Sequence, residues 1–330
     1  MKTALINQSI DAGEQAKLRG DYLEARSAFE TALEDSDPLV VGTAWHCLGK
    51  LAWHEGAFES AGQYFEKARA IAMRLDAAEL RARSEIGLGG VYFARGDYHR
   101  ARQFYEGIRA NPLGSEFKGM VALNLGAIAN IEGDIAAAER HYTRASRAFA
   151  EVGDVAGQAQ AWHNLGMLHA DRLEWDQADE AYGRSLELSE QTGNREMVGM
   201  VIMNRSEMSC AMGRYEEAVA RCDAALTIFA EIGAEVLRGT TLRWKGRALR
   251  ELGQYVLAER ALTEAMRIAH RAQARLLEAE TMQELGAMLA LSGDGAAGRK
   301  WLQRSLDMFK ALGATRESNE VEADLRALEP

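Results

Sequence analysis

Proline is scarce in this sequence, with 3 residues among 330 against a usual share of about 5%. Proline interrupts a helix more strongly than any other residue, and alanine, the best helix former, is abundant here. Pro38 and Pro112 fall between the expected helices, where a missing backbone N–H does no harm. The composition therefore predicts a chain that is almost wholly α-helical.

Long uncharged apolar runs are also absent, which argues against a membrane-spanning helix. The first eight residues turn polar before the apolar core of a signal peptide could develop. A hydrophobic content of 47% excludes disorder. We therefore expect a folded protein of the cytoplasm.

Cysteine is rare and unpaired in the sequence. Cys47, Cys210 and Cys222 form no CxxC pair, and no cysteine–histidine set has the spacing of a zinc site. This usage suits a reducing compartment. The 39 basic and 49 acidic residues give a net charge of −10, which repels nucleic acid and anionic membrane surfaces. We expect no metal, no cofactor, no nucleic-acid partner and no membrane partner.

A period close to 40 residues runs through the whole chain. It shows first in the glycines Gly20, Gly56, Gly96, Gly133, Gly213, Gly253 and Gly293, with Leu173 in place of the missing member. Five residues after each of these positions lies a small residue: Ala25, Ala61, Ala101, Ala138, Ala178, Ala218, Ala258 and Gly298. Four residues further lies a larger one: Phe29, Phe65, Tyr105, Tyr142, Tyr182, Cys222, Leu262 and Leu302.

These positions predict a repeated helix hairpin. The glycine ends a first helix and permits a tight turn, the small residue lets two helices approach, and the large residue fills the gap between them. An aspartate follows the glycine at Asp21, Asp97, Asp134 and Asp294, where its side chain can cap the second helix. A hairpin of this size cannot bury its own apolar stripe, so neighbouring hairpins must stack into a solenoid.

The first helices of the hairpins carry a fuller signature, with Leu48-Gly49, Leu88-Gly89, Leu125-Gly126, Leu165-Gly166 and Leu285-Gly286. With this signature the chain resembles the tetratricopeptide repeat family, in the lengthened form of kinesin light chains, spindle-orientation adaptors and bacterial Rap-type receptors. The resemblance implies an all-α, right-handed α-solenoid (superhelix) of eight hairpins and one domain over 1–330. Its repeats start near residues 6, 42, 82, 119, 159, 199, 239 and 279, and 319–330 form a capping helix. Repeat six has Arg205-Ser206 in place of Leu-Gly, which makes close packing there less certain.

Catalytic motifs are missing from the sequence. There is no phosphate-binding loop of P-loop spacing, and the glycine-rich Gly87–Gly90 lies within a helix rather than after a strand. His46 and His54 share a helical face but stand two turns apart, about 12 Å, which is too far for one metal ion. No nucleophile is accompanied by a base. We therefore expect a protein that is not an enzyme and has no catalytic residue.

The resemblance places the binding surface on the concave face, at positions two, five, six, nine, twelve and thirteen of each repeat. Position six gives Asn124, Asn164 and Asn204 in three consecutive repeats. Asparagine is a poor choice in the middle of a helix, and its amide offers a donor and an acceptor that suit the main chain of an extended peptide. The alternative is that these amides bond a neighbouring helix or water.

Other residues at lining positions complete the predicted peptide-binding groove. Methionine and leucine make it apolar and adaptable, at Met120, Leu123, Met200 and Met203. Repeat seven adds Trp244 beside Arg243, Arg247 and Arg250, which share one helical face. Three like charges on one face are unfavourable unless an anionic group lies there. The spacing leaves open a docking site for an acidic part of a ligand, salt bridges to a glutamate of an adjacent repeat, such as Glu207 or Glu284, or a solvated face.

Two functions remain open from the sequence. The first is a non-enzymatic scaffold or adaptor that binds an extended peptide segment of a protein partner in its concave groove. The alternative is a regulatory receptor whose small ligand or signalling peptide changes the superhelix. Native mass spectrometry of the purified protein would show a bound small ligand only for the second. The oligomeric state stays open, although a capped solenoid can exist as a monomer.

Overall fold

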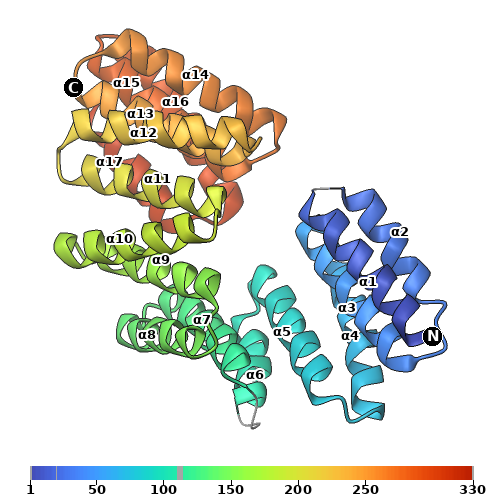
Figure 1. Ribbon diagram of the computed structural model, residues 1–330. Coiled ribbons are helices and arrows are strands. Elements are labelled where there is room, and N and C mark those ends of the chain that lie inside the picture. Colours follow the sequence, from blue (N-terminus) through green and yellow to red (C-terminus); the bar gives the residue numbers. More distant parts are fainter. Residues whose placement is uncertain (1, 20, 110–113, 329–330) are drawn as a thin grey trace. The chain divides into compact units, whose positions relative to one another are not determined.

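Seventeen α-helices and no β-strand occur among the residues described by the computed structural model, and the helices hold 85% of these described residues. The described residues are 2–19, 21–109 and 114–328, without the side chains of residues 2–7 and 18, so Gly20 and Pro112 lie outside them. The helices of Figure 1 are α1 Lys2–Leu18, α2 Tyr22–Ala32, α3 Pro38–His54, α4 Phe58–Arg74, α5 Ala78–Ala94, α6 Tyr98–Arg109, α7 Ser115–Ile131, α8 Ile135–Glu151, α9 Val155–Asp171, α10 Trp175–Gln191, α11 Arg195–Ala211, α12 Tyr215–Glu231, α13 Glu235–Glu251, α14 Tyr255–Arg271, α15 Arg275–Leu291, α16 Gly295–Leu312 and α17 Thr315–Ala327. The predicted all-α fold of stacked helix hairpins is confirmed.

The helices form two compact units, Met1–Ala161 and Trp162–Pro330, that divide within α9. From α1 to α8 and from α10 to α17, each helix packs against the next one along the chain. First helices of successive hairpins also contact each other, for example α3 with α5 and α13 with α15. In the first unit, for example, α3 and α4 run antiparallel as one hairpin (Figure 1). The single domain over 1–330 that the sequence suggests stays a prediction.

The turns between helices use the left-handed conformation that the glycine series predicts. Gly56, Gly133 and Gly253 have φ values of 74°, 80° and 70°, which a glycine adopts without steric cost. At the position where the series lacks a glycine, Leu173 takes the same conformation with a φ of 60°. The N–H of Asp134, just after such a turn, bonds the carbonyl of Ala129 at 2.9 Å, which closes the helix end in a Schellman arrangement.

The aspartates after the turns cap the second helices as predicted. A side-chain oxygen of Asp134 accepts a hydrogen bond of 2.9 Å from the N–H of Ala137, and Asp294 does the same for Ala297 at 3.0 Å. Asp21 and Asp97 cap α2 and α6 in the same way. Each bond satisfies one of the backbone donors that a helix leaves free at its start.

The interior of each hairpin contains the small and large residues that the sequence pattern predicts. All seven alanines of the close-contact series and Gly298 are buried, and the large residues four positions later are also buried. The signature glycine of the first helix lies against that large residue: a Cβ added to Gly49 would stand 2.6 Å from the Phe65 ring, and one added to Gly166 2.5 Å from Tyr182. The glycine is therefore required by the ring that faces it.

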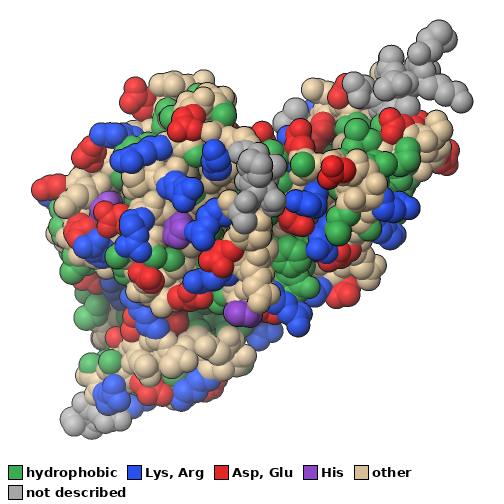
Figure 2. Space-filling view, turned by 90° about the horizontal axis from the view of Figure 1, so that it is seen from below, with side chains coloured by type: hydrophobic (Ala, Val, Ile, Leu, Met, Phe, Trp, Pro, Cys, Tyr) green, Lys and Arg blue, Asp and Glu red, His purple; other side chains and the backbone are tan. Residues whose placement is uncertain are grey.

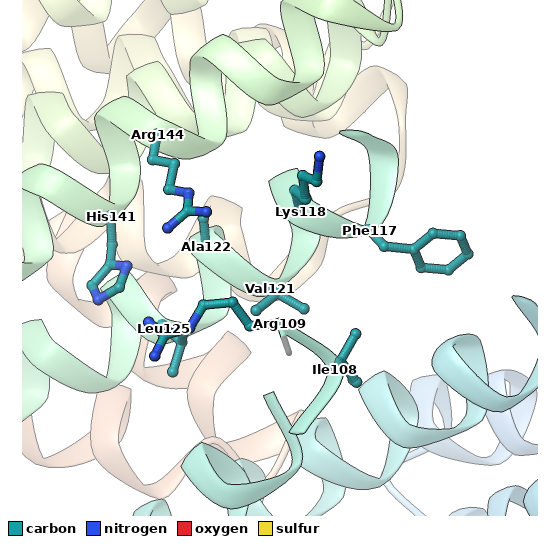
Figure 3. Close-up of a pocket in the computed structure, with 9 residues that line it drawn as sticks. All are labelled: Ile108, Arg109, Phe117, Lys118, Val121, Ala122, Leu125, His141 and Arg144. Atoms are coloured by element: carbon teal, nitrogen blue, oxygen red, sulfur yellow. The ribbon is translucent and has the colours of Figure 1, made fainter. Parts of the chain in front are cut away.

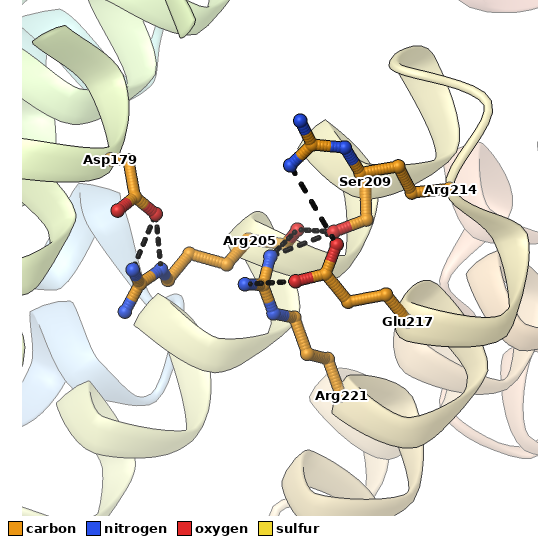
Figure 4. Close-up of polar contacts among 6 residues, drawn as sticks. All are labelled: Asp179, Arg205, Ser209, Arg214, Glu217 and Arg221. Atoms are coloured by element: carbon orange, nitrogen blue, oxygen red, sulfur yellow. Dashed lines mark hydrogen bonds and ion pairs between the residues drawn. The ribbon is translucent and has the colours of Figure 1, made fainter. Parts of the chain in front are cut away.

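Repeat six keeps its close packing by a different pair of residues. Ser206 replaces the glycine, and the residue facing it is the small Cys222, whose Sγ lies 3.3 Å from the serine Oγ. Arg205, in place of the usual leucine, turns outward and forms an ion pair with Asp179 of α10 (Figure 4). On the other side, Arg221 of α12 donates to the Arg205 carbonyl at 3.0 Å. The less certain packing expected here is resolved by these compensating contacts.

The last helix begins earlier than the sequence predicted. The capping helix was expected over 319–330, but α17 spans Thr315–Ala327, and residues 329–330 lie outside the described part. Gly313 ends α16 in the left-handed conformation with a φ of 71°, so a new helix can start two residues later. Val321 is fully buried against the last hairpin, as a cap requires. No described helix has both the length and the apolar character needed to cross a bilayer.

Candidate functional site

A groove of about 990 Å³ opens in the second unit between first helices of successive repeats. Its walls come from α11, α13, α15 and α17, with Phe309 of α16 at one side. The lining includes charged side chains of both signs: Glu207, Arg243, Arg247, Arg275, Glu280, Glu284, Arg316, Glu317 and Glu320. A smaller cavity of about 360 Å³ continues it along Arg247, Arg250 and Asp324. The four helices thus present one polar channel.

The arginines of α13 contact glutamates of α15. Arg243 Nε lies 3.3 Å from Glu280 Oε2, and Arg250 Nη1 lies 3.2 Å from Glu284 Oε2. Arg247 approaches the other oxygen of Glu284 at 3.8 Å. Among the alternatives that the sequence left open, the structure therefore places glutamates of the adjacent repeat against these arginines.

This network is buried but incompletely hydrogen-bonded. Arg243 is 8% exposed and Glu284 is 7% exposed. Arg243 Nε, Arg250 Nε and Glu284 Oε2 make no hydrogen bond within the described structure, although each belongs to an ion pair. A buried polar atom without a hydrogen bond costs about 1–3 kcal/mol, and more when it is charged. The groove floor therefore has unused donor and acceptor capacity.

Two acidic side chains on the groove wall, Glu207 and Glu280, lie near other carboxyl groups. Burial raises the pKa of Glu207, and Asp171 and Glu280 add to the rise while Arg243 opposes it. Burial also raises the pKa of Glu280, and Arg243 opposes this while Glu317 and Glu284 add to it. Glu207 forms no ion pair with a described residue. A cationic group brought into the groove would be attracted to this place.

The apolar part of the groove comes from Trp244 and Met203. Both are largely buried in the core between α11, α12 and α13. The Trp244 ring also lies under two guanidinium groups, with its centroid 4.2 Å from Arg243 Cζ and 5.4 Å from Arg247 Cζ. These cation–π contacts hold both arginines in place.

The three predicted asparagines are not gathered in one described site. Asn124 belongs to the first unit, where its Nδ2 donates to the Met120 carbonyl of its own helix at 2.9 Å. It also borders a cavity of about 180 Å³ with Lys50 and Trp53. Asn204 lies in the second unit, and its Nδ2 donates to His163 Nε2 at 2.9 Å. Asn164 is half-buried beside that histidine.

Some of the remaining predicted residues line the groove and others lie outside it. Met203, Arg243, Trp244 and Arg247 line the groove, and Arg250 lines its continuation. Met200 is half-buried against the core of α11 and α12 and is not part of the groove lining. Met120 is half-buried and Leu123 is buried in α7 of the first unit. The structure thus brings the arginines, Trp244 and Met203 together and leaves the other predicted residues elsewhere.

The lining positions of the sequence contain the acidic and amide residues of the groove, of which only Glu207 and Glu284 were named from the sequence. Glu280, Gln283 and Glu284 occupy positions two, five and six of repeat eight, and Glu207 occupies position nine of repeat six. Reading the lining positions of repeat eight gives Glu280, Gln283 and Glu284, and position nine of repeat six gives Glu207. Residues of the last helix, such as Arg316 and Glu320, have no such signal because this helix lies outside the repeat pattern.

Replacing Asn204 by alanine should lower stability. The mutation leaves His163 Nε2 without its partner, and that histidine is only 4% exposed. Burial lowers the pKa of His163 to about 4, so the ring is neutral near pH 7 and needs a donor at Nε2. We expect a loss of about 1–3 kcal/mol, measured by urea unfolding. Asn194→Ala, which removes an exposed helix cap, is a matched control with a loss of about 1 kcal/mol. Equal unfolding midpoints for Asn204→Ala and the unaltered chain would contradict this contact.

The described residues contain no group of three or more histidine, cysteine or acidic side chains placed to hold a metal ion. All three cysteines are buried and free. Burial raises the pKa of Cys47 and of Cys210 to about 12, so these thiols are protonated at neutral pH. These cysteines are small side chains packed in the protein interior.

Repeated antiparallel hairpins with a polar groove on their first helices define a helical-repeat scaffold of the kind that takes part in protein–protein interaction. The family model for the tetratricopeptide repeat matches residues 40–107, 119–191 and 199–271. These segments cover more than half of the chain, and the chain belongs to the tetratricopeptide repeat family. No curated protein sequence is similar enough to this chain to count as a relative.

Solved structures show the same fold at low sequence identity. A Rap protein in complex with competence and sporulation factor is 13% identical, with a TM-score of 0.62, and the match covers 99% of this chain and 96% of that one. The apo form of RapI is 17% identical, with a TM-score of 0.59 and coverage of 75% and 97%. Aspartyl phosphate phosphatase F from Bacillus subtilis is 10% identical, with a TM-score of 0.60 and coverage of 99% and 94%. At these identities the likeness concerns the fold alone.

Proposed function

We propose that this protein is a non-catalytic scaffold of the cytoplasm whose second unit binds an extended segment of a partner protein. The segment lies in the groove between α11, α13, α15 and α17. The observation that carries the proposal is the buried and incompletely hydrogen-bonded network of Arg243, Arg250 and Glu284 along the groove and its continuation. A ligand that brings both donors and acceptors would satisfy it.

A peptide main chain has that property, since each residue offers an N–H and a carbonyl. The size of the groove, about 990 Å³, is at the upper end of the range for single small ligands. Its continuation past Arg250 extends the channel along the same helices. Both features favour an elongated ligand over a compact one.

The charges of the groove favour a segment with groups of both signs. An acidic side chain of the ligand would meet Arg247, whose side chain is 42% exposed and whose ion pair with Glu284 is long, at 3.8 Å. A basic side chain would meet Glu207. Arg243 contributes less to ligand binding, because Glu280 already neutralises it. Hydrogen bonds from Asn124, Asn164 and Asn204 to a ligand main chain stay a prediction.

Selection of peptides from a random displayed library against the purified protein tests the proposal. We expect selected peptides to bind the unaltered protein and to bind Arg247→Ala about tenfold more weakly, since one charge-assisted hydrogen bond is worth about 1.5 kcal/mol. The affinity should fall as salt rises. Isothermal titration calorimetry measures both effects.

Arg267→Ala is the matched control, because Arg267 is a similarly exposed arginine on a second helix and pairs with Glu264 outside the groove. It should leave the affinity unchanged. Peptides that bind both variants equally well would reject the groove as the binding surface. A small molecule seen by native mass spectrometry on the purified protein, and displaced by no peptide, would favour the receptor alternative.

A further inference from the structure

A second, smaller cavity lies in the first unit, between the end of α6, the start of α7 and the middle of α8 (Figure 3). Its accessible volume is about 40 Å³. The floor is apolar and consists of Ile108, Phe117, Val121, Ala122 and Leu125, all of them buried. Four basic or ionisable side chains surround this floor: Arg109, Lys118, His141 and Arg144. None of the described residues that line the cavity is acidic.

The rim therefore concentrates positive charge in a chain whose net charge is −10. In Figure 3 the guanidinium groups of Arg109 and Arg144 reach toward the His141 ring from two different helices. Lys118 and Arg144 form no ion pair with a described residue, and the pair of Arg109 with Glu106 is long, at 4.0 Å. On the face seen in Figure 2, acidic and basic side chains are intermixed.

The pKa of His141 is affected by burial and by this positive charge. Burial lowers the pKa of His141, and the positive charges of Arg109, Arg144, Arg140 and Arg102 lower it further. These groups stand on α6 and α8, and Lys118 of α7 completes the rim. Like charges that converge without an anion repel one another, and an anion bound among them would remove that repulsion.

The shape of the cavity restricts the apolar part of such an anion. A volume of about 40 Å³ holds roughly three water-sized positions, which is enough for the methyl groups of a branched alkyl end but not for a ring. The floor offers this end only carbon atoms. The basic side chains line the same small cavity, so the charged group must be joined to the alkyl end through a few bonds.

We propose that this cavity binds a carboxylate carried on a short branched hydrocarbon, with the alkyl end on Val121 and Leu125 and the carboxylate among Arg109, Lys118 and Arg144. Such a group occurs in a free branched-chain acid and in the last residue of a protein chain that ends in leucine. The two sources share the chemistry of recognition. This site is separate from the peptide groove, which belongs to the other unit.

Binding is measured by NMR, through the C–H signals of His141 during titration with three probes. 4-Methylpentanoate represents the free acid, N-acetyl-leucine represents a chain end, and N-acetyl-leucinamide is the same molecule without the charge. We expect both acids to shift the His141 signals and to raise the pKa of His141 toward its ordinary value, because a bound anion favours the imidazolium. By linkage, both acids should bind more tightly as the pH falls through the pKa of His141. The amide should have no effect.

Two charge-reversal variants on α8 distinguish binding in the cavity from nonspecific electrostatic attraction to the surface. Arg144→Glu should weaken binding of the acids at least about tenfold, since it replaces an attractive charge by a repulsive one. Arg147→Glu makes the same change one turn further along, at an exposed residue that does not line the cavity, and should change the affinity less than about twofold. Circular dichroism melting verifies that both variants fold.

The outcomes are distinct. Tighter binding of 4-methylpentanoate than of N-acetyl-leucine supports the free acid as the occupant, and the reverse order supports a chain end. The proposal fails if the amide binds as well as the acids, if acetate alone binds as tightly, or if neither acid moves the His141 signals. It also fails if the two charge reversals weaken binding equally. None of these results depends on whether the groove of the second unit binds a peptide.

Discussion

Replacing Ala178 of α10 by tryptophan should clearly destabilise the second unit. Ala178 is fully buried and belongs to a core cluster with Tyr182, Val201 and Met208. It holds the close-contact position that the repeat pattern assigns in repeat five, so the indole would have to displace these side chains. Overpacking of this kind costs about 1–3 kcal/mol, and sometimes more. We expect the melting temperature to fall by about 2–4 °C for each kcal/mol lost.

The neighbouring Gln177 provides the control, because it is exposed on the same helix turn. Gln177→Trp introduces the same side chain and should leave the melting temperature nearly unchanged. Differential scanning calorimetry compares the two variants with the unaltered chain. A wild-type melting temperature for Ala178→Trp would show that the close-contact position is assigned incorrectly.

Replacing Cys222 by tyrosine should also destabilise the fold, by about 1–3 kcal/mol. Tyrosine is the residue at the equivalent position of the preceding repeat, Tyr182, where it faces Gly166. In repeat six the facing residue is Ser206, whose Cβ would stand where a Cβ added to Gly166 lies 2.5 Å from the ring. No side chain can accept that distance, so one of the two helices must move.

The double variant Ser206→Gly with Cys222→Tyr should recover much of this loss, because it restores the glycine–ring pair of the other repeats. The recovery is expected to be incomplete, since Ser206 also donates a hydrogen bond of 2.6 Å to the Met203 carbonyl. The coupling free energy between the two substitutions, obtained from urea unfolding of both single variants and the double one, should exceed about 1 kcal/mol. Strictly additive effects would mean that Ser206 and Cys222 were not selected as a pair.

The partners of the groove arginines could not be predicted from the sequence. The arginines of repeat seven could be named from their spacing, but the spacing allowed two partners for them, a ligand or a glutamate of the next repeat. Glu280 and Glu284 lie 37 residues away from Arg243 and Arg247 in the chain, and only the packing of α13 against α15 brings them to 3.3 Å and 3.8 Å. Asn204 likewise meets His163 only because α9 and α11 are neighbours.

The sequence by itself determined the helices, the turns and the close contacts of each hairpin. Gly133 and Ala138 recur at fixed spacing because backbone conformation and the distance between two helices are decided within a few residues. The tertiary structure alone decided which charges are neutralised, as at Arg243, and which are left to gather, as at Arg144 and Lys118. Charge pairing depends on side chains that meet from different helices, and no periodicity within one helix specifies such a meeting.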